Sequence, residues 1–186
     1  MSYVEVFVIN KDGLVSSYGE AKNNHCFAPM VWQRLADQHR LNIGGEHLFL
    51  SDKVLKPLWK MAGTGKLPLE DDLLLQSTFD YVMIPKMLVE PLAERMRSFY
   101  NTELRERNIV PTMIDLANII EESIKEVPDA LGVCFNCCSA NEPYWTVRST
   151  STRIDNSHPR DILKEKGKAW WIDTEYFRSL VEKEGT

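Results

Sequence analysis

Apolar residues follow the spacing of strands in some segments of the chain and the spacing of helices in others. The first segments have the pattern of two short strands. Residues 3–9 form a nearly unbroken run of β-branched and aromatic residues, and residues 14–18 form a shorter run, with Asp12 and Gly13 between them. An Asp-Gly step between two such runs is a strong hairpin signal, because glycine accepts the positive φ of a tight hairpin turn. We therefore expect a β-hairpin near the N-terminus.

Three later segments have apolar residues at the spacing of an amphipathic helix. Pro29 suits the first turn of the first helix and Pro91 that of the second. In the third, Thr112 has the position of an N-cap and Pro128 predicts the end. A shorter helix is expected from Ser51 to Lys60. The residues expected to face the core are Val31, Trp32, Leu35 and Ala36 in the first helix, Leu88, Leu92, Met96 and Phe99 in the second, and Met113, Ala117, Ile120, Ile124 and Val127 in the third.

The remaining apolar runs predict further strands. Phe79–Ile84 has the pattern of a strand that Pro85 stops, and residues 132–138 and 144–150 have the pattern of a second hairpin. The strands do not alternate regularly with helices, as they do in a doubly wound parallel fold. The order of elements instead predicts an α+β fold, in which an antiparallel or mixed sheet has its helices packed mainly on one face. The length of 186 residues and the apolar fraction of 44% suit a single globular domain over residues 1–186.

The charge of the chain limits the partners to be expected. The formal net charge is -5, which argues against a surface built for nucleic acid or anionic membranes. The exception is segment 148–168, in which six Lys or Arg and three Asp or Glu give a local excess of positive charge. This segment could contact phosphate or bases, although its alternating signs are also those of a solvated loop. No signal-peptide order and no run of about 20 apolar residues is present, so we expect a cytoplasmic protein without a membrane segment.

Three of the four cysteines, Cys134, Cys137 and Cys138, fall close together in the sequence. Side chains alternate between the faces of a strand, so Cys134 and Cys138 would share one face and Cys137 would lie on the other. A structural zinc site needs four ligands, and no second Cys or His pair at the usual distance completes the set. We therefore expect reduced thiols packed as small apolar side chains, with no bound metal and no cofactor. Metal and disulfide chemistry are the alternatives.

Other polar motifs are incomplete as catalytic or ligand sites. His25 and Cys26 precede a helix start, where the helix dipole would favour a thiolate, but the sequence identifies no third group that orients the imidazole. Gly63–Lys66 matches only the end of the phosphate-binding loop pattern. The glycine that should begin the pattern and the Ser or Thr that should follow the lysine are both missing, so we expect a surface turn. The acidic runs Glu70–Asp72 and Glu121–Glu122 are expected on solvated helix faces, because adjacent helical residues do not face each other.

The tryptophans complete the functional prediction. Trp32 and Trp59 lie in helical patterns and are expected in the core. The other three lie near polar connections, and tryptophan is enriched where a partner buries a surface. The candidate interface is therefore Trp145, Trp170 and Trp171, unless these rings close the end of the sheet. Since no catalytic set is complete, we favour a non-catalytic protein over an enzyme: a regulator, inhibitor or immunity-type protein that binds a protein partner or a second copy of itself.

The alternative function is an enzyme or small-ligand binder with a polar cleft between the first helix and the last hairpin. Such a cleft forms only if the two predicted hairpins are neighbours in the sheet. Acid/base chemistry there would need a thiol or carboxylate within hydrogen-bond reach of His25. The expected polar and aromatic lining is His25, Cys134, Asn136, Asn141, Glu142 and Trp145.

Overall fold

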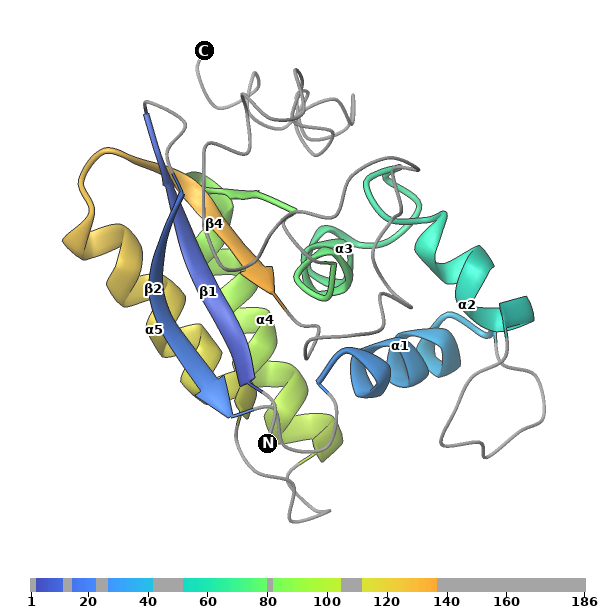
Figure 1. The fold of residues 1–186 in the computed structure, drawn as a ribbon. Coiled ribbons are helices and arrows are strands. Elements are labelled where there is room, and N and C mark those ends of the chain that lie inside the picture. Colours follow the sequence, from blue (N-terminus) through green and yellow to red (C-terminus); the bar gives the residue numbers. More distant parts are fainter. Residues whose placement is uncertain are drawn as a thin grey trace.

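The computed structural model describes residues 3–11, 15–22, 27–41, 52–79, 82–104 and 112–136 (Figure 1). Its antiparallel sheet has four strands in the order β2-β1-β4-β3. The strands span Tyr3–Asn10 (β1), Val15–Lys22 (β2), Ile84–Pro85 (β3) and Ala130–Asn136 (β4). The pairing of β1 with β2 confirms the N-terminal hairpin. Because β4 pairs with β1, strands from the two predicted hairpin regions are neighbours in the sheet.

The helices lie behind the sheet and beside it (Figure 1). Helix α5 packs on β2, β1 and β4, helix α4 packs on α5, and both lie behind the sheet in Figure 1. Helix α3 packs against α4, and α1 packs against α3 and α2. No helix within the described ranges is long and apolar enough to cross a membrane. The helices are Phe27–Gln38 (α1), Asp52–Trp59 (α2), Leu69–Gln76 (α3), Val89–Phe99 (α4) and Thr112–Glu126 (α5), with short helical turns at Lys86–Leu88 (η1) and Tyr100–Leu104 (η2).

The arrangement confirms the α+β class, and the strand register shows which residues face the helices. Directly paired residues of an antiparallel ladder point to the same face. Val6 pairs with Gly19, and a Cβ atom at Gly19 would lie 3.2 Å from Cγ2 of Ile119 on α5, so Val6 faces the helices. Glu5 and Phe7 alternate with Val6 and therefore face the opposite side. Val6 and Phe7 are both buried, so β1 is covered on both faces.

The apolar faces predicted for the three long helices are buried. All the expected core positions of α1, η1 and α4 are buried, as are Met113, Ala117 and Ile120 on α5. Ile124 and Val127 are partly buried against the same core. The predicted cap at Thr112 is wrong: Thr112 is the first residue of α5, and its hydroxyl donates to the carbonyl of Lys22 at 2.8 Å, which ties the helix to the end of β2.

The predicted strand Phe79–Ile84 is wrong at Phe79, Val82 and Met83 and right at Ile84, and its residues 80 and 81 lie outside the described residues. The chain leaves α3 through successive turns, in which the backbone N–H groups of Thr78 and Phe79 donate to the carbonyls of Leu75 and Gln76. Strand pairing begins only at Ile84, opposite Val133, and β3 is a short edge strand. An edge position suits Pro85, which has no N–H to donate to a further strand. Residues 144–150 of the second predicted hairpin lie outside the described residues.

Candidate functional site

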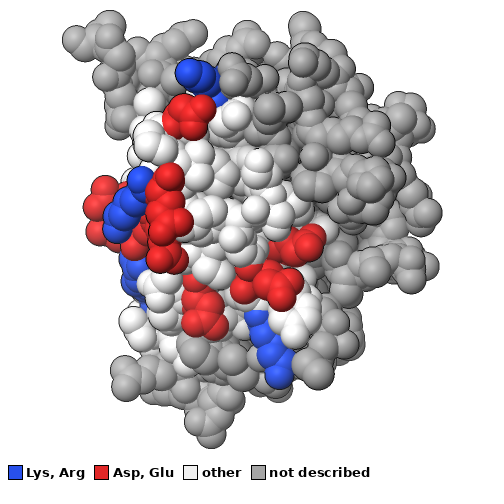
Figure 2. Space-filling model, turned by 60° about the vertical axis from the view of Figure 1, so that its left-hand side comes forward, with Lys and Arg blue, Asp and Glu red and all other residues white. Residues whose placement is uncertain are grey.

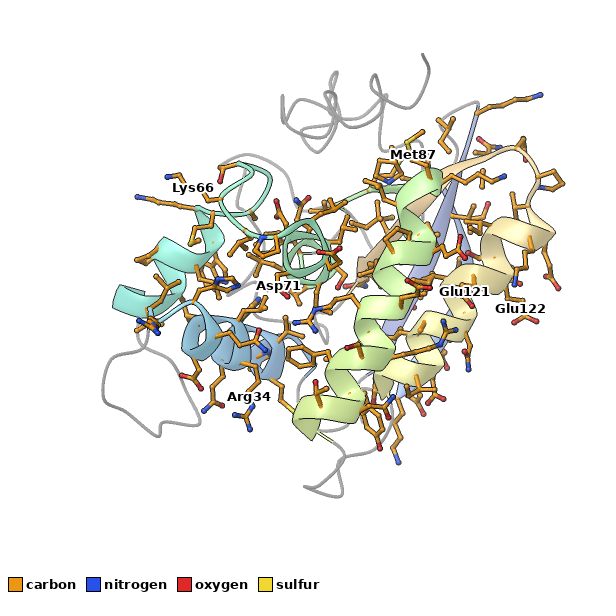
Figure 3. All side chains as sticks on the ribbon, turned by 180° about the vertical axis from the view of Figure 1, so that it is seen from behind. Arg34, Lys66, Asp71, Met87, Glu121 and Glu122 are labelled. Carbon is orange, nitrogen blue, oxygen red and sulfur yellow. The ribbon has the colours of Figure 1, made fainter. Side chains whose placement is uncertain are left out.

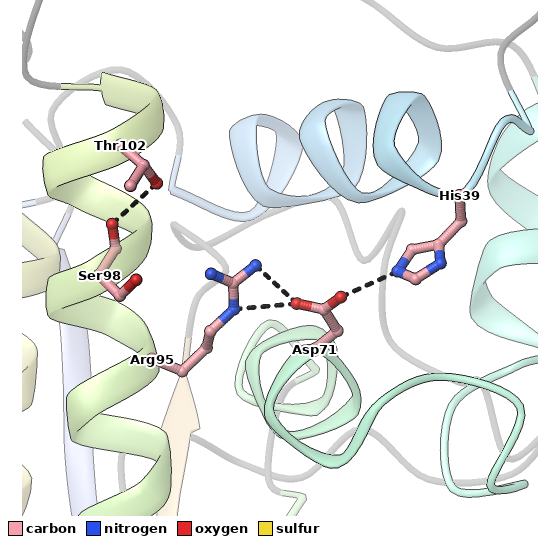
Figure 4. Close-up of polar contacts among 5 residues, drawn as sticks. All are labelled: His39, Asp71, Arg95, Ser98 and Thr102. Carbon is pink, nitrogen blue, oxygen red and sulfur yellow. Dashed lines mark hydrogen bonds and ion pairs between the residues drawn. The ribbon is translucent and has the colours of Figure 1, made fainter.

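A chain of charged side chains joins three helices (Figure 4). Asp71 on α3 lies between His39, just after α1, and Arg95 on α4. The Nε2 atom of His39 lies 2.9 Å from Oδ2 of Asp71. Two nitrogens of Arg95 contact Oδ1, with Nε at 2.9 Å and Nη2 at 2.6 Å. The three side chains are only 13–21% exposed, so solvent screens this cluster less than it would a surface ion pair.

The chemistry open to this cluster is limited by its contacts. A carboxylate that holds one imidazole nitrogen can orient a histidine for acid/base work. Asp71, however, is also neutralised by Arg95, whose guanidinium lies 5.4 Å from the ring centre of Phe99. Among the described residues, His39 has no hydrogen-bond partner for its side chain other than Asp71, and therefore no nucleophile to activate. The geometry supports a role in fixing α1, α3 and α4 relative to one another.

Asp72, the next residue of α3, has different surroundings. Its carboxylate is fully buried and accepts from the backbone N–H of Gly63, at 2.9 Å and 3.1 Å to its two oxygens, and from Nε2 of Gln76 at 3.0 Å. No cation balances its charge in these contacts. Burial raises the pKa of Asp72, and the hydrogen bonds from Gln76 and Gly63 offset part of that rise. Asp72 thus connects α3 to the turn before it.

These contacts correct one sequence expectation and agree with another. Asp71 and Asp72 were expected on a solvated helix face, but both are buried, because the apolar residues that follow them make α3 an interior helix. The Gly63–Lys66 segment is a turn with Thr64, Gly65 and Lys66 exposed, as expected (Figure 3). The N–H group of Gly63 that a phosphate-binding loop would offer to a ligand is instead bonded to Asp72.

Two residues of the predicted polar cleft, Cys134 and Asn136, lie on one face of β4. Cys134 forms no disulfide bond and has no solvent exposure, in keeping with a small apolar core residue. Asn136 is 6% exposed and pairs directly with Glu5 on β1. Its Nδ2 group donates to Oε2 of Glu5 at 3.0 Å, whereas its Oδ1 atom is buried without a hydrogen-bond partner among the described residues.

The other predicted site residues fall outside the described part of the chain. They are the rest of the predicted cleft, the candidate interface, the basic segment 148–168 and the other three cysteines. Over the ranges that are described, no group of three or more His, Cys, Asp or Glu side chains is placed to hold a metal ion. No protein-family model, no curated protein and no solved structure matches the chain.

The outer surface of α4 and α5 carries several charged residues that are exposed to solvent. On these two helices the exposed charged residues are five acids and one base, Lys125. Figure 2, which turns the side carrying α5 forward, shows this surface edge-on, with red and blue side chains together along its left-hand edge beside a mostly uncharged area. We call this surface the acidic face; its exposed carboxylates are Glu90, Glu94, Asp115, Glu122 and Glu126.

Two hydrogen-bonded pairs border the acidic face. Arg97 of α4 makes two 2.8 Å contacts with the carboxylate oxygens of Glu121 on α5, and this pairing lowers the pKa of Glu121. The phenol of Tyr18 on β2 donates to Oε2 of Glu126 at 2.6 Å. This hydrogen bond is the main reason that the pKa of Tyr18 rises to about 12. Within the described part of the chain, the five exposed carboxylates themselves form no ion pair.

Sequence reasoning missed the residues that organise these polar contacts, namely Glu5, His39, Asp71, Asp72 and Arg95. One signal was available: Asp71 and Asp72 come directly before the unbroken apolar run Leu73–Leu75, which is typical of a buried element. No comparable signal marks Glu5 or Arg95. Their partners are 131 and 24 residues away along the chain, so only the fold brings them together.

Proposed function

We propose that the protein acts by binding a partner protein with a basic surface, and that the acidic face of α4 and α5 contributes to this contact. The observation that carries the proposal is the excess of exposed acids over bases on the two helices. Complementary charge speeds the encounter of two proteins and selects against partners of like charge. A partner with exposed lysines and arginines fits this surface.

The contacts of the reactive side chains favour binding over catalysis. His39 is held by a carboxylate that Arg95 already neutralises, and Cys134 has no exposed surface. A catalytic thiol or general base has to reach its substrate. Cys134 does not meet that condition, and His39 is held through Nε2 by the neutralised carboxylate of Asp71, whereas the carboxylates of the acidic face are open to solvent.

The three tryptophans singled out from the sequence belong to the same proposal. Trp145, Trp170 and Trp171 would supply the apolar part of an interface to which the acidic face adds charge. Buried aromatic anchors contribute most of the binding energy in many interfaces, while charged rims act mainly on association rate and specificity. We therefore propose that the three tryptophan rings provide most of the binding energy and that the carboxylates of the acidic face select the partner.

The test is charge reversal on the acidic face. Glu94→Lys and Glu122→Lys are made singly and together, and the matched control is Glu70→Lys, which reverses an exposed acid on α3. Each protein is immobilised and used to capture partners from a cell extract, with quantification by mass spectrometry at low and high salt. We expect a basic protein that the wild-type chain and Glu70→Lys retain, that the double variant loses, and that high salt releases.

The outcome against the proposal is equally defined. If the double variant retains the same proteins as the wild-type chain, the acidic face does not select the partner. Light scattering of the purified proteins, done in parallel, reports self-association. If the wild-type protein and the control form a dimer and the double variant does not, the partner of the acidic face is a second copy of the chain and not a basic protein.

A further inference from the structure

Three oxygen-bearing side chains form a row across the sheet, on the face that points away from α4 and α5. Glu5 on β1 pairs directly with Glu20 on β2 and with Asn136 on β4. Directly paired residues share one face, with Cβ atoms roughly 5 Å apart. We propose that Glu20, Glu5 and Asn136 form a binding site for a calcium ion. This proposal is independent of the acidic face, which lies on the other side of the sheet.

Within the described part of the chain, the row lacks a cation of its own. Two carboxylates directly opposite each other in a sheet repel and destabilise the pairing, unless a positive charge lies between them. The only hydrogen bond between described side chains in the row is the one that Asn136 donates to Glu5. Lys22 is on the same face two residues from Glu20, but it forms no ion pair with either glutamate. A bound cation would relieve the repulsion.

The second observation is the orphan oxygen of Asn136. Asn136 as a whole residue is 6% exposed, and its buried Oδ1 atom has no hydrogen-bond partner among the described residues. The bond from Nδ2 to Glu5 fixes the orientation of the amide group, so the acceptor atom is Oδ1. A buried acceptor without a donor costs free energy, and a bound ion can supply the missing partner of such an atom.

Burial increases along the row toward this atom. Glu20 is exposed, Glu5 is half-buried and Asn136 is buried. An ion can therefore exchange its water for protein oxygens step by step, starting at Glu20. The carboxylate and amide oxygens are the ligands that calcium prefers, and calcium accepts an irregular arrangement completed by water, whereas magnesium demands a near-octahedral one.

The test is a titration of the whole chain, stripped of metal with a chelator, with calcium chloride and separately with magnesium chloride. The side-chain amide signal of Asn136 in a nitrogen–proton correlation spectrum is the readout, assigned with Asn136→Ala. We expect a saturable shift with calcium. Glu5→Gln should weaken calcium binding about tenfold, because it removes one charged ligand. The matched control Glu94→Gln removes one exposed acid from α4 and should leave the affinity within about twofold.

Three results would overturn the proposal: no saturable shift up to about 10 mM calcium, an equal response to magnesium, or equal losses in Glu5→Gln and Glu94→Gln. If Glu5→Gln fails to fold, Glu20→Gln gives the same test, because its side chain is exposed and can be changed without opening the core. The titration needs no partner protein, so its failure leaves the proposed function untouched.

Discussion

Neighbouring aspartates on one helix experience opposite electrostatic environments. Asp71 is held by Arg95 and His39, so its negative charge is matched. Asp72 receives only neutral donors, Gly63 and Gln76, in a site without solvent exposure. Desolvation penalises the charged form of a carboxyl group and a nearby cation favours it. One helix therefore places one carboxylate in a stabilising contact and the other where ionisation works against folding.

The pH dependence of stability should expose Asp72. Its pKa in the folded protein is raised above the ordinary value of 3.8, which applies to the unfolded chain. At a pH between the unfolded-state pKa and the folded-state pKa, the folded state therefore binds more protons than the unfolded state. Stability from this group is therefore lost as pH rises through that window and does not return above it. Asp72→Asn removes the ionisation while keeping an oxygen acceptor for Gly63 and Gln76.

We expect the unfolding free energy of the wild-type protein to fall relative to that of Asp72→Asn as pH rises above about 4. Denaturant unfolding at a series of pH values measures the difference. Glu70→Gln is the control, because Glu70 is exposed on the same helix. A difference between wild type and Asp72→Asn that stays constant with pH would show that Asp72 ionises as freely in the folded state as in the unfolded state.

Tyr18 is a second residue whose titration reports a single contact. Its pKa is raised to about 12 chiefly by the hydrogen bond to Glu126. Phenolate absorbance, taken as the difference between the wild-type protein and Tyr18→Phe, isolates this group from the other tyrosines. In Glu126→Gln the pKa of Tyr18 should move back toward its ordinary value of about 10. An unchanged titration curve in that variant would place the cause elsewhere than in the β2–α5 contact.

At the scale of elements, predictability follows the regularity of the apolar pattern. Helices α1, α4 and α5 could be predicted because each buries one stripe of an otherwise polar helix, which leaves a periodic signal. Helix α3 carries no such signal, because all of its residues from Asp71 to Gln76 are buried. The short strand β3 was misplaced for a related reason: Phe79 and Val82 are apolar because they are buried in turns, and burial alone does not distinguish a strand from a turn.

The pairing of β3 with β4 depends on the absence of a side chain at Gly132. A Cβ atom there would lie 2.2 Å from the carbonyl oxygen of Ile84 and 2.9 Å from Cγ of Met83. A backbone oxygen cannot move aside without disturbing the ladder. Gly132→Ala should therefore lower the unfolding free energy by at least about 1–3 kcal/mol, the usual cost of overpacking.

The matched control for this prediction is Gly19→Ala. A Cβ atom at Gly19 would meet the side chain of Ile119 at 3.2 Å, and that side chain can shift by a few tenths of an ångström. Denaturant unfolding of the two variants should give the larger loss for Gly132→Ala. Equal losses would indicate that both glycines are needed for backbone conformation alone and that the β3–β4 contact tolerates a side chain.

At the scale of the whole molecule, the candidate site could be predicted only in part. From the sequence, strand alternation could place the side chain of Cys134 on one face of a strand, because alternation is a local property. It could not identify Glu5 as the partner of Asn136, since that contact depends on β4 lying next to β1 after most of the chain has intervened. The location of the charge could not be predicted either. The composition shows that the chain is acidic overall, but only the packing of α4 against α5 brings the exposed acids of these helices onto one surface.

The proposed interface makes a prediction that separates binding from folding. Trp170→Ala with Trp171→Ala should weaken partner capture about tenfold or more, as the loss of buried aromatic anchors does in other interfaces, with little change in melting temperature. Trp32→Ala is the contrasting control, because Trp32 is buried, donates from Nε1 to Oγ1 of Thr78 at 2.7 Å and packs edge-on against Trp59. Loss of that core ring should cost about 3–5 kcal/mol. If the Trp170 and Trp171 variant loses stability as Trp32→Ala does, the two rings support the fold, and partner binding would have to rest on the acidic face alone.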